Sequence, residues 1–324
     1  MKNKVKGNKK GMFIVLCIVV FIFSFVGGII FKLTYDPTHG KYKAHWDDET
    51  GKIYKDIAYG ELEANKFDLY VPIDNSKESY GLIVYLHAGG FKTGDKKDDA
   101  EILKYYASKG YVTAGINYSL NTDDHPEYNI KTMSMEIKSA MPAVVNEAKK
   151  LGYNIDGIAM GGGSAGGCLA LLYAYRDAND APVPVKMVFE AVGPSSFYPE
   201  DWKSYGLDKD SKAAADLFSY MTGIKITEDM FNTKEYDALM KDVSPLLWIN
   251  ENTVPTVIAY GKHDKFQPYE GSLRLDEALT KNNVDHQYFV LEHSGHGLQN
   301  DTKVCMEYMD TIEEYLNKYM PIKQ

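Results

Sequence analysis

A short glycine-rich stretch has the residue types of a nucleophilic serine site. Gly162, Ser164 and Gly166 follow the pattern G-x-S-x-G, which is typical of a strained turn that presents a serine between a strand and a helix. Both flanks supply that context, because an apolar run, 157–160, precedes the serine and a run of good helix formers, 168–174, follows it. A glycine- and serine-rich loop without chemistry has the same composition, so the partner residues must decide between the two readings.

A serine hydroxyl needs a base to take its proton, and the base needs a carboxylate to orient it. On such a turn the acid and then the histidine follow the serine along the chain. Asp264 comes soon after an apolar run, 256–260, and His296 soon after the last such run, 286–291. We therefore expect both side chains at the same strand ends as the serine. His293 is the alternative base, and we favour His296 because it lies within the turn, between two glycines.

A second loop offers backbone N–H groups for a developing negative charge. The sequence His87-Ala88-Gly89-Gly90 follows a continuous apolar run and differs by one residue from the H-G-G-G form of an oxyanion loop. We expect the amides of Gly89 and Gly90, together with the amide of Ala165 beside the nucleophile, to form the oxyanion hole. The histidine of this loop is expected to be structural.

The elements that must position these groups alternate along the chain. Apolar runs predict strands at 52–59, 66–71, 81–86, 111–118, 157–160, 185–192, 256–260 and 286–291. Helical periodicity or composition predicts helices at 98–108, 130–151, 168–174, 269–279 and 302–319. We expect the first two strands to be an antiparallel edge pair and the rest to form a mostly parallel sheet with helices on both faces. In such a fold ligands bind at the carboxyl ends of the strands, where each motif lies.

The alternation stops between residues 193 and 254. This stretch contains Trp202, Tyr205, Phe218 and Tyr220 and is longer than an ordinary connection. It predicts a cap inserted over the site, at about 195–250, with a plain surface excursion as the alternative.

The N-terminal region predicts a membrane anchor. Residues 1–10 contain five lysines and no acidic residue, and residues 11–31 contain no charge. As a helix these 21 uncharged residues would span about 31 Å, which matches the hydrocarbon thickness of a bilayer. The positive-inside rule then places residues 1–10 in the cytoplasm, a polar linker at 32–51 and a domain at 52–324 outside. A cleaved signal peptide with secretion of the domain is the alternative.

Composition excludes some function classes. The formal net charge of −9 and the pI near 5.4 argue against nucleic acid as a partner. The histidines show no H-E-x-x-H or other metal-ligand spacing, so no metal is expected, and a serine, histidine and aspartate need no organic cofactor. Cys168 and Cys305 are expected to pack as small apolar residues rather than to form a disulfide. The sequence leaves the oligomeric state open.

Together the motifs resemble α/β-hydrolases of the esterase/lipase type, close to the hormone-sensitive-lipase-like and feruloyl-esterase-like carboxylesterases. The residues that carry the resemblance are 87–91, 117–120, 162–167, 244–245, 261–264 and 293–297. The resemblance extends over residues 52–320 and implies the α/β-hydrolase fold and ester hydrolysis through an acyl-enzyme.

The expected function is therefore that of a membrane-anchored extracytoplasmic serine hydrolase. Its Ser-His-Asp triad would cleave small carboxylic esters, of short-acyl or acylated-carbohydrate type. A serine peptidase or amidase with the same fold is one alternative. A surface binding module with a catalytically silent triad is the other, because a fold alone does not fix a function.

Overall fold

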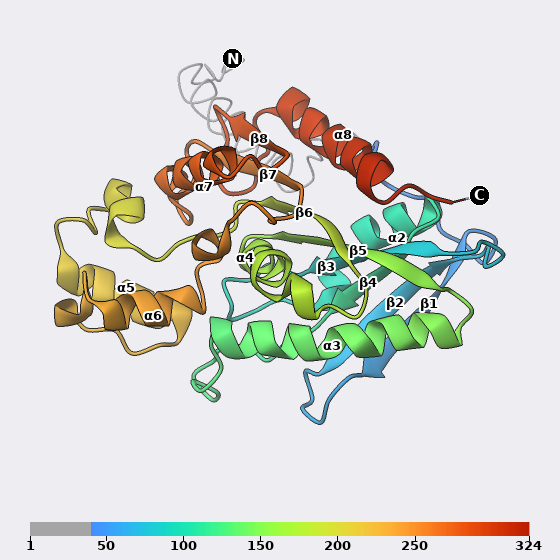
Figure 1. The fold of residues 1–324 in the computed structure, drawn as a ribbon, viewed down its shortest axis with the longest axis horizontal. Coiled ribbons are helices and arrows are strands. Elements are labelled where there is room, and N and C mark those ends of the chain that lie inside the picture. The colour runs from blue at the N-terminus through green and yellow to red at the C-terminus, as the bar shows by residue number, and fades with distance from the viewer. Residues whose placement is uncertain (1–39, 324) are drawn as a thin grey trace, which may run out of the picture.

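The computed structural model describes residues 40–323, which form one eight-stranded sheet with helices on both faces (Figure 1). The strands are β1 Gly51–Ala58, β2 Lys66–Pro72, β3 Tyr80–Leu86, β4 Val112–Ile116, β5 Ile155–Gly163, β6 Val185–Ala191, β7 Thr256–Gly261 and β8 His286–Leu291. Their order in the sheet is β1-β2-β4-β3-β5-β6-β7-β8. Because β5 is a central strand, the serine turn that follows it lies near the middle of the row formed by the strand ends.

The strand directions agree with the sequence prediction. β1 pairs antiparallel with β2, β2 pairs antiparallel with β4, and every other neighbouring pair is parallel. The antiparallel edge pair is therefore confirmed, and the parallel strands direct their carboxyl ends to one edge of the sheet.

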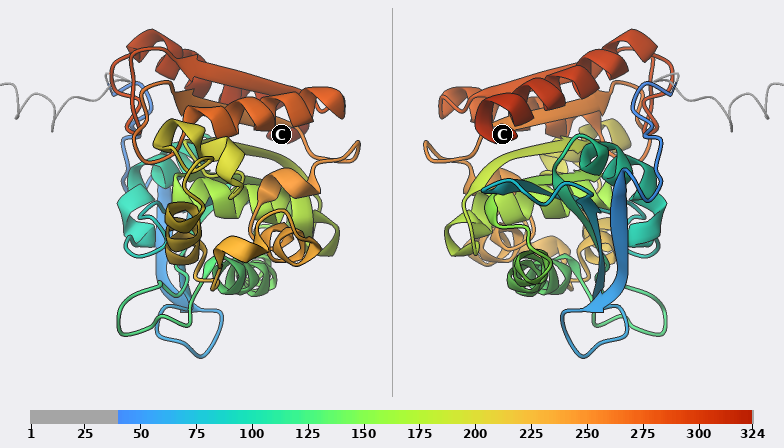
Figure 2. Two further views of the ribbon diagram at one scale, coloured as in Figure 1. Left: turned by 90° about the vertical axis from the view of Figure 1, so that its left-hand side faces the viewer. Right: turned by 90° about the vertical axis from the view of Figure 1, so that its right-hand side faces the viewer.

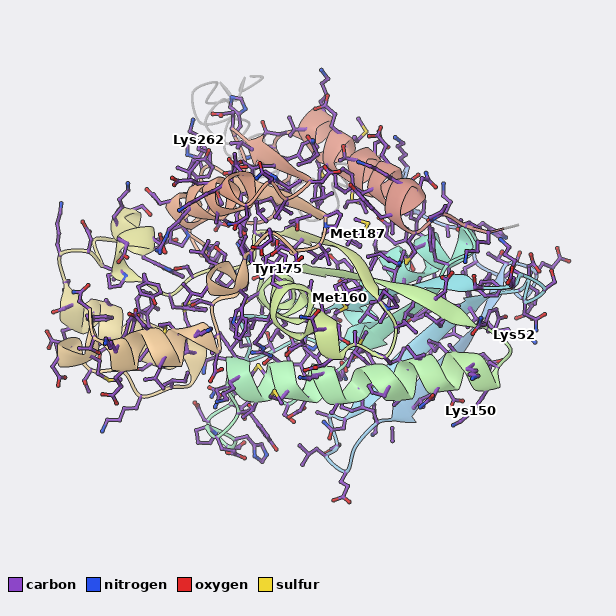
Figure 3. All side chains as sticks on the ribbon, in the orientation of Figure 1. Lys52, Lys150, Met160, Tyr175, Met187 and Lys262 are labelled. Atoms are coloured by element: carbon purple, nitrogen blue, oxygen red, sulfur yellow. The ribbon has the colours of Figure 1, made fainter. Side chains whose placement is uncertain are left out.

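Two layers of helices cover the sheet because its strands are apolar on both faces. Two helices, α2 Ala100–Ser108 and α8 Thr302–Tyr319, cover one face. The helices α3 Ile130–Lys150, α4 Ala165–Leu172 and α7 Tyr269–Lys281 pack on the other. Figure 2 shows α8 and α3 on opposite sides of the sheet. Met160 on β5 and Met187 on β6, both labelled in Figure 3, belong to the cores of the two different layers.

The predicted insertion lies between β6 and β7, at the left-hand end of the molecule in Figure 1. It contains the helices α5 Ser211–Thr222 and α6 Lys234–Lys241 and three short 3₁₀ segments, Pro199–Tyr205, Glu228–Met230 and Pro245–Trp248. Aromatic rings hold these short pieces together: Phe218 packs edge-to-face against Phe197, Trp202 and Phe231. These rings belong to the same buried cluster as the core under α3 and α4, so tertiary packing stabilises the short helices of the insertion.

The second half of the linker predicted at 32–51 lies against the domain. Within residues 40–50 the hydroxyl of Tyr42 donates to Asp310 and to the carbonyl of Met306 on α8, and Trp46 packs edge-to-face on Tyr70. These residues therefore lie on the domain rather than forming a free tether, because burial of two aromatic rings favours the contact.

The predicted cytoplasmic segment 1–10 and membrane span 11–31 lie outside the described residues. Among residues 40–323, no helix is both long and apolar enough to cross a membrane.

Candidate active site

The serine turn adopts the strained backbone that its sequence predicts. Ser164, between β5 and α4, has φ 52° and ψ −121°, a conformation that is uncommon for a residue with a side chain. Its N–H donates to the carbonyl of Ala191 at the end of β6, at 2.8 Å. A Cβ on Gly162 would lie 2.4 Å from the carbonyl carbon of Gly166, and one on Gly166 would lie 1.9 Å from the carbonyl oxygen of Leu86. Glycine at both positions therefore permits the turn.

Three side chains from three strand ends meet at this turn. The hydroxyl of Ser164 lies 2.9 Å from Nε2 of His296, and Nδ1 of His296 lies 2.7 Å from Oδ2 of Asp264. The other carboxylate oxygen of Asp264 accepts from the backbone N–H groups of Phe266 and Gln267, at 2.7 and 3.0 Å. The carboxylate is 1% exposed and the imidazole 27%. The geometry permits proton transfer from the serine to the imidazole, with the carboxylate fixing the ring.

The alternative base lies elsewhere. Nδ1 of His293 donates to Asp301 at 2.8 Å, and the side chain of His293 is 79% exposed. The structure thus brings His296, and not His293, within hydrogen-bond distance of the serine hydroxyl.

The predicted oxyanion loop lies beside the serine. Gly89 and Gly90 have φ values of +127° and +60°, which favour glycine. Within residues 40–323, the amides of Gly89, Gly90 and Ala165 donate to no protein acceptor, and all three residues line the pocket at Ser164. These N–H groups are therefore available to an oxygen atom of a bound substrate. Their participation in catalysis stays a prediction.

His87 has the structural setting expected of it. Its side chain is buried, and its Nδ1–H donates to the carbonyl of Ala88 at 2.8 Å. Its ring stacks on Tyr118, with ring centroids 4.3 Å apart, and the Tyr118 hydroxyl donates to the His87 carbonyl at 2.8 Å. Burial lowers the pKa of His87 below its usual value. A neutral, stacked imidazole at the start of the loop holds the loop in place.

A pocket of about 790 Å³ opens at Ser164 and His296. Its walls are mainly apolar and aromatic, and they include Phe91, Val192, Pro194, Trp202, Tyr205, Leu217, Tyr220, Met221, Phe266 and Leu298. Three of these side chains are exposed, Tyr205 by 40%, Tyr220 by 61% and Phe266 by 74%. The Phe266 ring lies 5.3 Å from that of His296. An apolar pocket with a few convergent polar groups is typical of a small-molecule site.

Most of the residues that line the pocket have no distinguishing signal in the sequence. Val192 follows β6, Leu217 and Met221 lie on α5, and Leu298 lies in the loop after β8. Of the four aromatics noted in the insertion, Trp202, Tyr205 and Tyr220 line the pocket, whereas Phe218 belongs to the core of the insertion. Among the pocket residues outside the insertion, Phe266 is the one that the sequence could have indicated, because it comes two residues after the predicted acid.

The remaining ligand-type residues do not cluster. Among residues 40–323 no group of three or more His, Cys, Asp or Glu side chains could hold a metal ion. Cys168 and Cys305 are both buried.

The BD-FAE family model matches residues 67–279, which include all but the first residue of β2, the strands β3 to β7 and the serine turn. This chain belongs to the BD-FAE family. The resemblance to esterases and lipases of the α/β-hydrolase type that the motifs indicated is thereby confirmed.

Curated relatives of this BD-FAE chain match only part of it. Kynurenine formamidase of Danio rerio is 26% identical over 132 residues, which are 41% of this chain and 42% of that protein. Lipase 2 of Moraxella sp. (strain TA144) is 29% identical over 117 residues, 33% of this chain and 26% of the lipase. The chain thus spans less than half the length of these relatives.

Solved structures match almost the whole fold of the BD-FAE chain. The esterase Est2 of Thermogutta terrifontis with propionate bound gives a TM-score of 0.64 at 20% identity, covering 84% of this chain and 96% of that one. A truncated carbohydrate esterase from gut microbiota gives 0.66 at 16% identity, covering 84% and 98%. Esterase B of Lactobacillus rhamnosis gives 0.64 at 16% identity, covering 93% and 95%. The predicted α/β-hydrolase fold with a mostly parallel sheet is therefore confirmed.

Proposed function

We propose that this chain is a serine hydrolase that cleaves carboxylic esters through an acyl-enzyme. The observation that supports this most is the hydrogen-bonded series from Ser164 through His296 to Asp264, with distances of 2.9 and 2.7 Å, at the mouth of an apolar pocket. Membership of the BD-FAE family and the esterases among similar structures support it from a separate direction.

The geometry suggests a role for each group. The hydroxyl of Ser164 attacks the ester carbonyl while Nε2 of His296 takes its proton, and Asp264 stabilises the imidazolium that forms. The amides of Gly89, Gly90 and Ala165 stabilise the negative oxygen of the tetrahedral intermediate. His296 then gives the proton to the leaving alkoxide, and water attacks the acyl-serine by the same steps with water in place of the serine hydroxyl.

The pocket favours small apolar groups on the ester. Its walls are aliphatic and aromatic, and among the residues that line it only Lys265 and the proposed base His296 have a basic side chain. Est2 of Thermogutta terrifontis is described with propionate and with butyrate bound, which supports short acyl groups as the first substrates to try.

The test is hydrolysis of p-nitrophenyl acetate, butyrate and octanoate by the full-length protein and by its Ser164→Ala variant. The proposal predicts that the parent protein hydrolyses these esters. In the Ser164→Ala variant it predicts that kcat falls by roughly 1,000-fold or more, because removal of a serine nucleophile has an effect of at least this order. Equal rates for a folded parent and a folded variant would overturn it.

Amide hydrolysis is a second candidate, because the chain is similar to kynurenine formamidase over 132 residues. The same serine, histidine and aspartate can cleave an amide when the histidine protonates the leaving amine. A comparison of p-nitrophenyl butyrate with an aryl formamide separates the two, since a higher kcat/KM for the formamide would favour the amidase.

We further propose that residues 11–31 anchor the domain on the outer face of a membrane. The support is the uncharged 21-residue stretch after five lysines. Membranes of cells that produce the full-length chain should keep the protein after alkaline extraction, and external protease should cleave the domain. Release of a shortened chain into the medium would instead indicate signal cleavage and secretion.

A further inference from the structure

The loop that contains His296 ends at an aspartate with an unusual set of partners. Residues 292–301 connect β8 to α8, and Asp301 occupies the position directly before α8. An aspartate at this position usually accepts a hydrogen bond from the first turn of its helix. The carboxylate of Asp301 makes no such bond to α8. The usual reason for an aspartate at a helix start therefore does not account for this side chain.

The carboxylate instead binds the beginning of its own loop. Oδ2 of Asp301 accepts from the backbone N–H of His293 at 2.9 Å and from the hydroxyl of Ser294 at 2.6 Å. Oδ1 accepts from Nδ1 of His293 at 2.8 Å. The carboxylate is only 9% exposed. Three hydrogen bonds thus join the two ends of the loop, and His296 lies in the segment between them.

The residue before Asp301 strengthens the same closure. The backbone N–H of Asn300 donates to the Ser294 hydroxyl at 3.0 Å, and its side-chain amide donates to the carbonyl of His293 at 2.7 Å. Because the Ser294 hydroxyl both donates to Asp301 and accepts from Asn300, its position is fixed from two sides.

The same loop also contacts the segment that contains Asp264. Ser294 is fully buried, and its carbonyl accepts from the N–H of His263, at 2.9 Å, directly before Asp264. A Cβ on Gly261 would lie 2.3 Å from the carbonyl oxygen of Gly295, so the two loops are in direct contact. A shift of Ser294 therefore changes the distance between Asp264 and His296.

Asp301 is suited to this role as an anion. Burial alone would raise the pKa of its carboxyl, but hydrogen bonds from Ser294 and His293 outweigh burial and lower the pKa below its usual value. Hydrogen bonds to a charged acceptor are shorter and stronger than those to a neutral one. An asparagine at this position would keep one acceptor and lose the charge.

We propose that Asp301 is a positioning residue that holds the His296 loop in register with Asp264. The proposal rests on the ester-hydrolase function proposed above, in which His296 is the base. Asp301 acts through His293 and Ser294 and touches neither the serine nor the pocket. His293, the alternative base, is instead a hydrogen-bond partner of Asp301.

The kinetic test compares Asp301→Ala and Asp301→Asn with Asp285→Asn in the full-length protein. Asp285 is a matched control, because its carboxylate accepts from Tyr315 and Lys318 at the far end of α8, at 2.7 and 2.6 Å. Asp301→Ala should lower kcat roughly 10- to 100-fold with KM within twofold, because small misplacements of a catalytic group have effects of this size. Asp301→Asn should lose less, and Asp285→Asn should lower the melting temperature without lowering kcat.

A spectroscopic readout separates this proposal from the proposed function. The proton on Nδ1 of His296, hydrogen-bonded to Asp264, should give a low-field proton NMR signal in the parent and in Asp285→Asn, and this signal should broaden or disappear in Asp301→Ala. If the parent shows no esterase activity, the proposed function fails, while loss of the signal still supports the positioning role. A sharp, unchanged signal in Asp301→Ala, or an unchanged kcat, overturns it.

Ser294→Ala covers the case in which Asp301→Ala does not fold. It removes one donor to the carboxylate and leaves the helix start and both histidines in place. It should reduce kcat in the same direction as Asp301→Asn, and an unchanged kcat together with an unchanged low-field signal would contradict the proposal.

Discussion

At the scale of single residues, the site depends on backbone conformations that few residue types adopt. Ser164 has a positive φ of 52°, and two glycines beside it lie against other backbone atoms without room for a Cβ. Gly89 and Gly90 likewise have positive φ values, but their surroundings differ. A Cβ on Gly89 would lie 1.9 Å from the carbonyl oxygen of Thr93, whereas one on Gly90 would meet no atom within 4 Å.

This difference predicts unequal effects of alanine in the oxyanion loop. Gly89→Ala should displace the loop and lower kcat by roughly 100-fold or more, on the order of the loss of one oxyanion donor. Gly90→Ala should cost about 1 to 2 kcal/mol of stability from backbone strain and keep most of the activity. Ester hydrolysis and thermal unfolding of both variants measure this, and equal losses of kcat in the two would contradict the assigned loop geometry.

The convergence of the three proposed catalytic side chains was predictable because each has a local signature. Ser164 directly follows β5, and Asp264 and His296 lie in the loops that follow β7 and β8, positions that the parallel sheet brings to one edge. Asp301 was not predictable, since an aspartate before a helix resembles an ordinary N-cap. Its bonds to the residues eight and seven positions earlier depend on how the loop folds.

At the scale of elements, tertiary pairing changed several predicted boundaries. β5 was expected to end at residue 160, because glycines disfavour strands, but its pairing with β3 and β6 extends it through Gly161 to Gly163. α4 was expected at 168–174, but it begins at Ala165 and is followed by a π-helical turn, Tyr173–Asp177. Arg176 within that turn donates to the carbonyl of Asp242 and to Ser134, partners that a local pattern does not contain.

The insertion has its effect at this same scale, because α5 provides one wall of the pocket through Leu217, Tyr220 and Met221. We predict that Met221→Trp, which adds bulk to this wall, lowers kcat/KM for p-nitrophenyl octanoate about tenfold relative to the acetate. The larger side chain excludes part of the octanoyl chain, and the loss of a methylene from an apolar pocket has an effect of this order. Met135→Trp on α3 is the control, because Met135 is exposed and lies outside the pocket. An equal loss for both esters would show that α5 does not limit acyl length.

At the scale of the whole molecule, the sheet contains a buried acid whose carboxylate lies against the first turn of α4. Glu190 on β6 is fully buried, and its Oε2 accepts from the N–H of Gly193 at 2.8 Å. Burial raises the pKa of Glu190 from 4.5 to about 8, although the hydrogen bond from the N–H of Gly193 partly opposes the rise. Between Glu190 and Gly193 the chain turns at Val192, whose φ of 53° is uncommon for a β-branched residue.

The raised pKa predicts how stability depends on pH. Between about pH 4.5 and 8 the folded state keeps the Glu190 proton and the unfolded state does not, so the free energy of unfolding should fall as pH rises through this window. Glu190→Gln should remove this contribution, so that denaturant unfolding of the variant depends less on pH than that of the parent. Glu235→Gln, at an exposed position on α6, is the control. A parental pH dependence that survives in Glu190→Gln would contradict the assignment.

The proposed mechanism requires Ser164 to be a nucleophile that His296 and Asp264 activate. Thermogutta terrifontis Est2 is described as phosphorylated by paraoxon, and the same reagent tests this chain directly. After treatment of the full-length protein, intact-mass and peptide analysis should find one diethylphosphoryl group, located on Ser164, and none on folded Ser164→Ala. A folded parent protein that gains no adduct, or a Ser164→Ala variant that gains it equally, would contradict this mechanism.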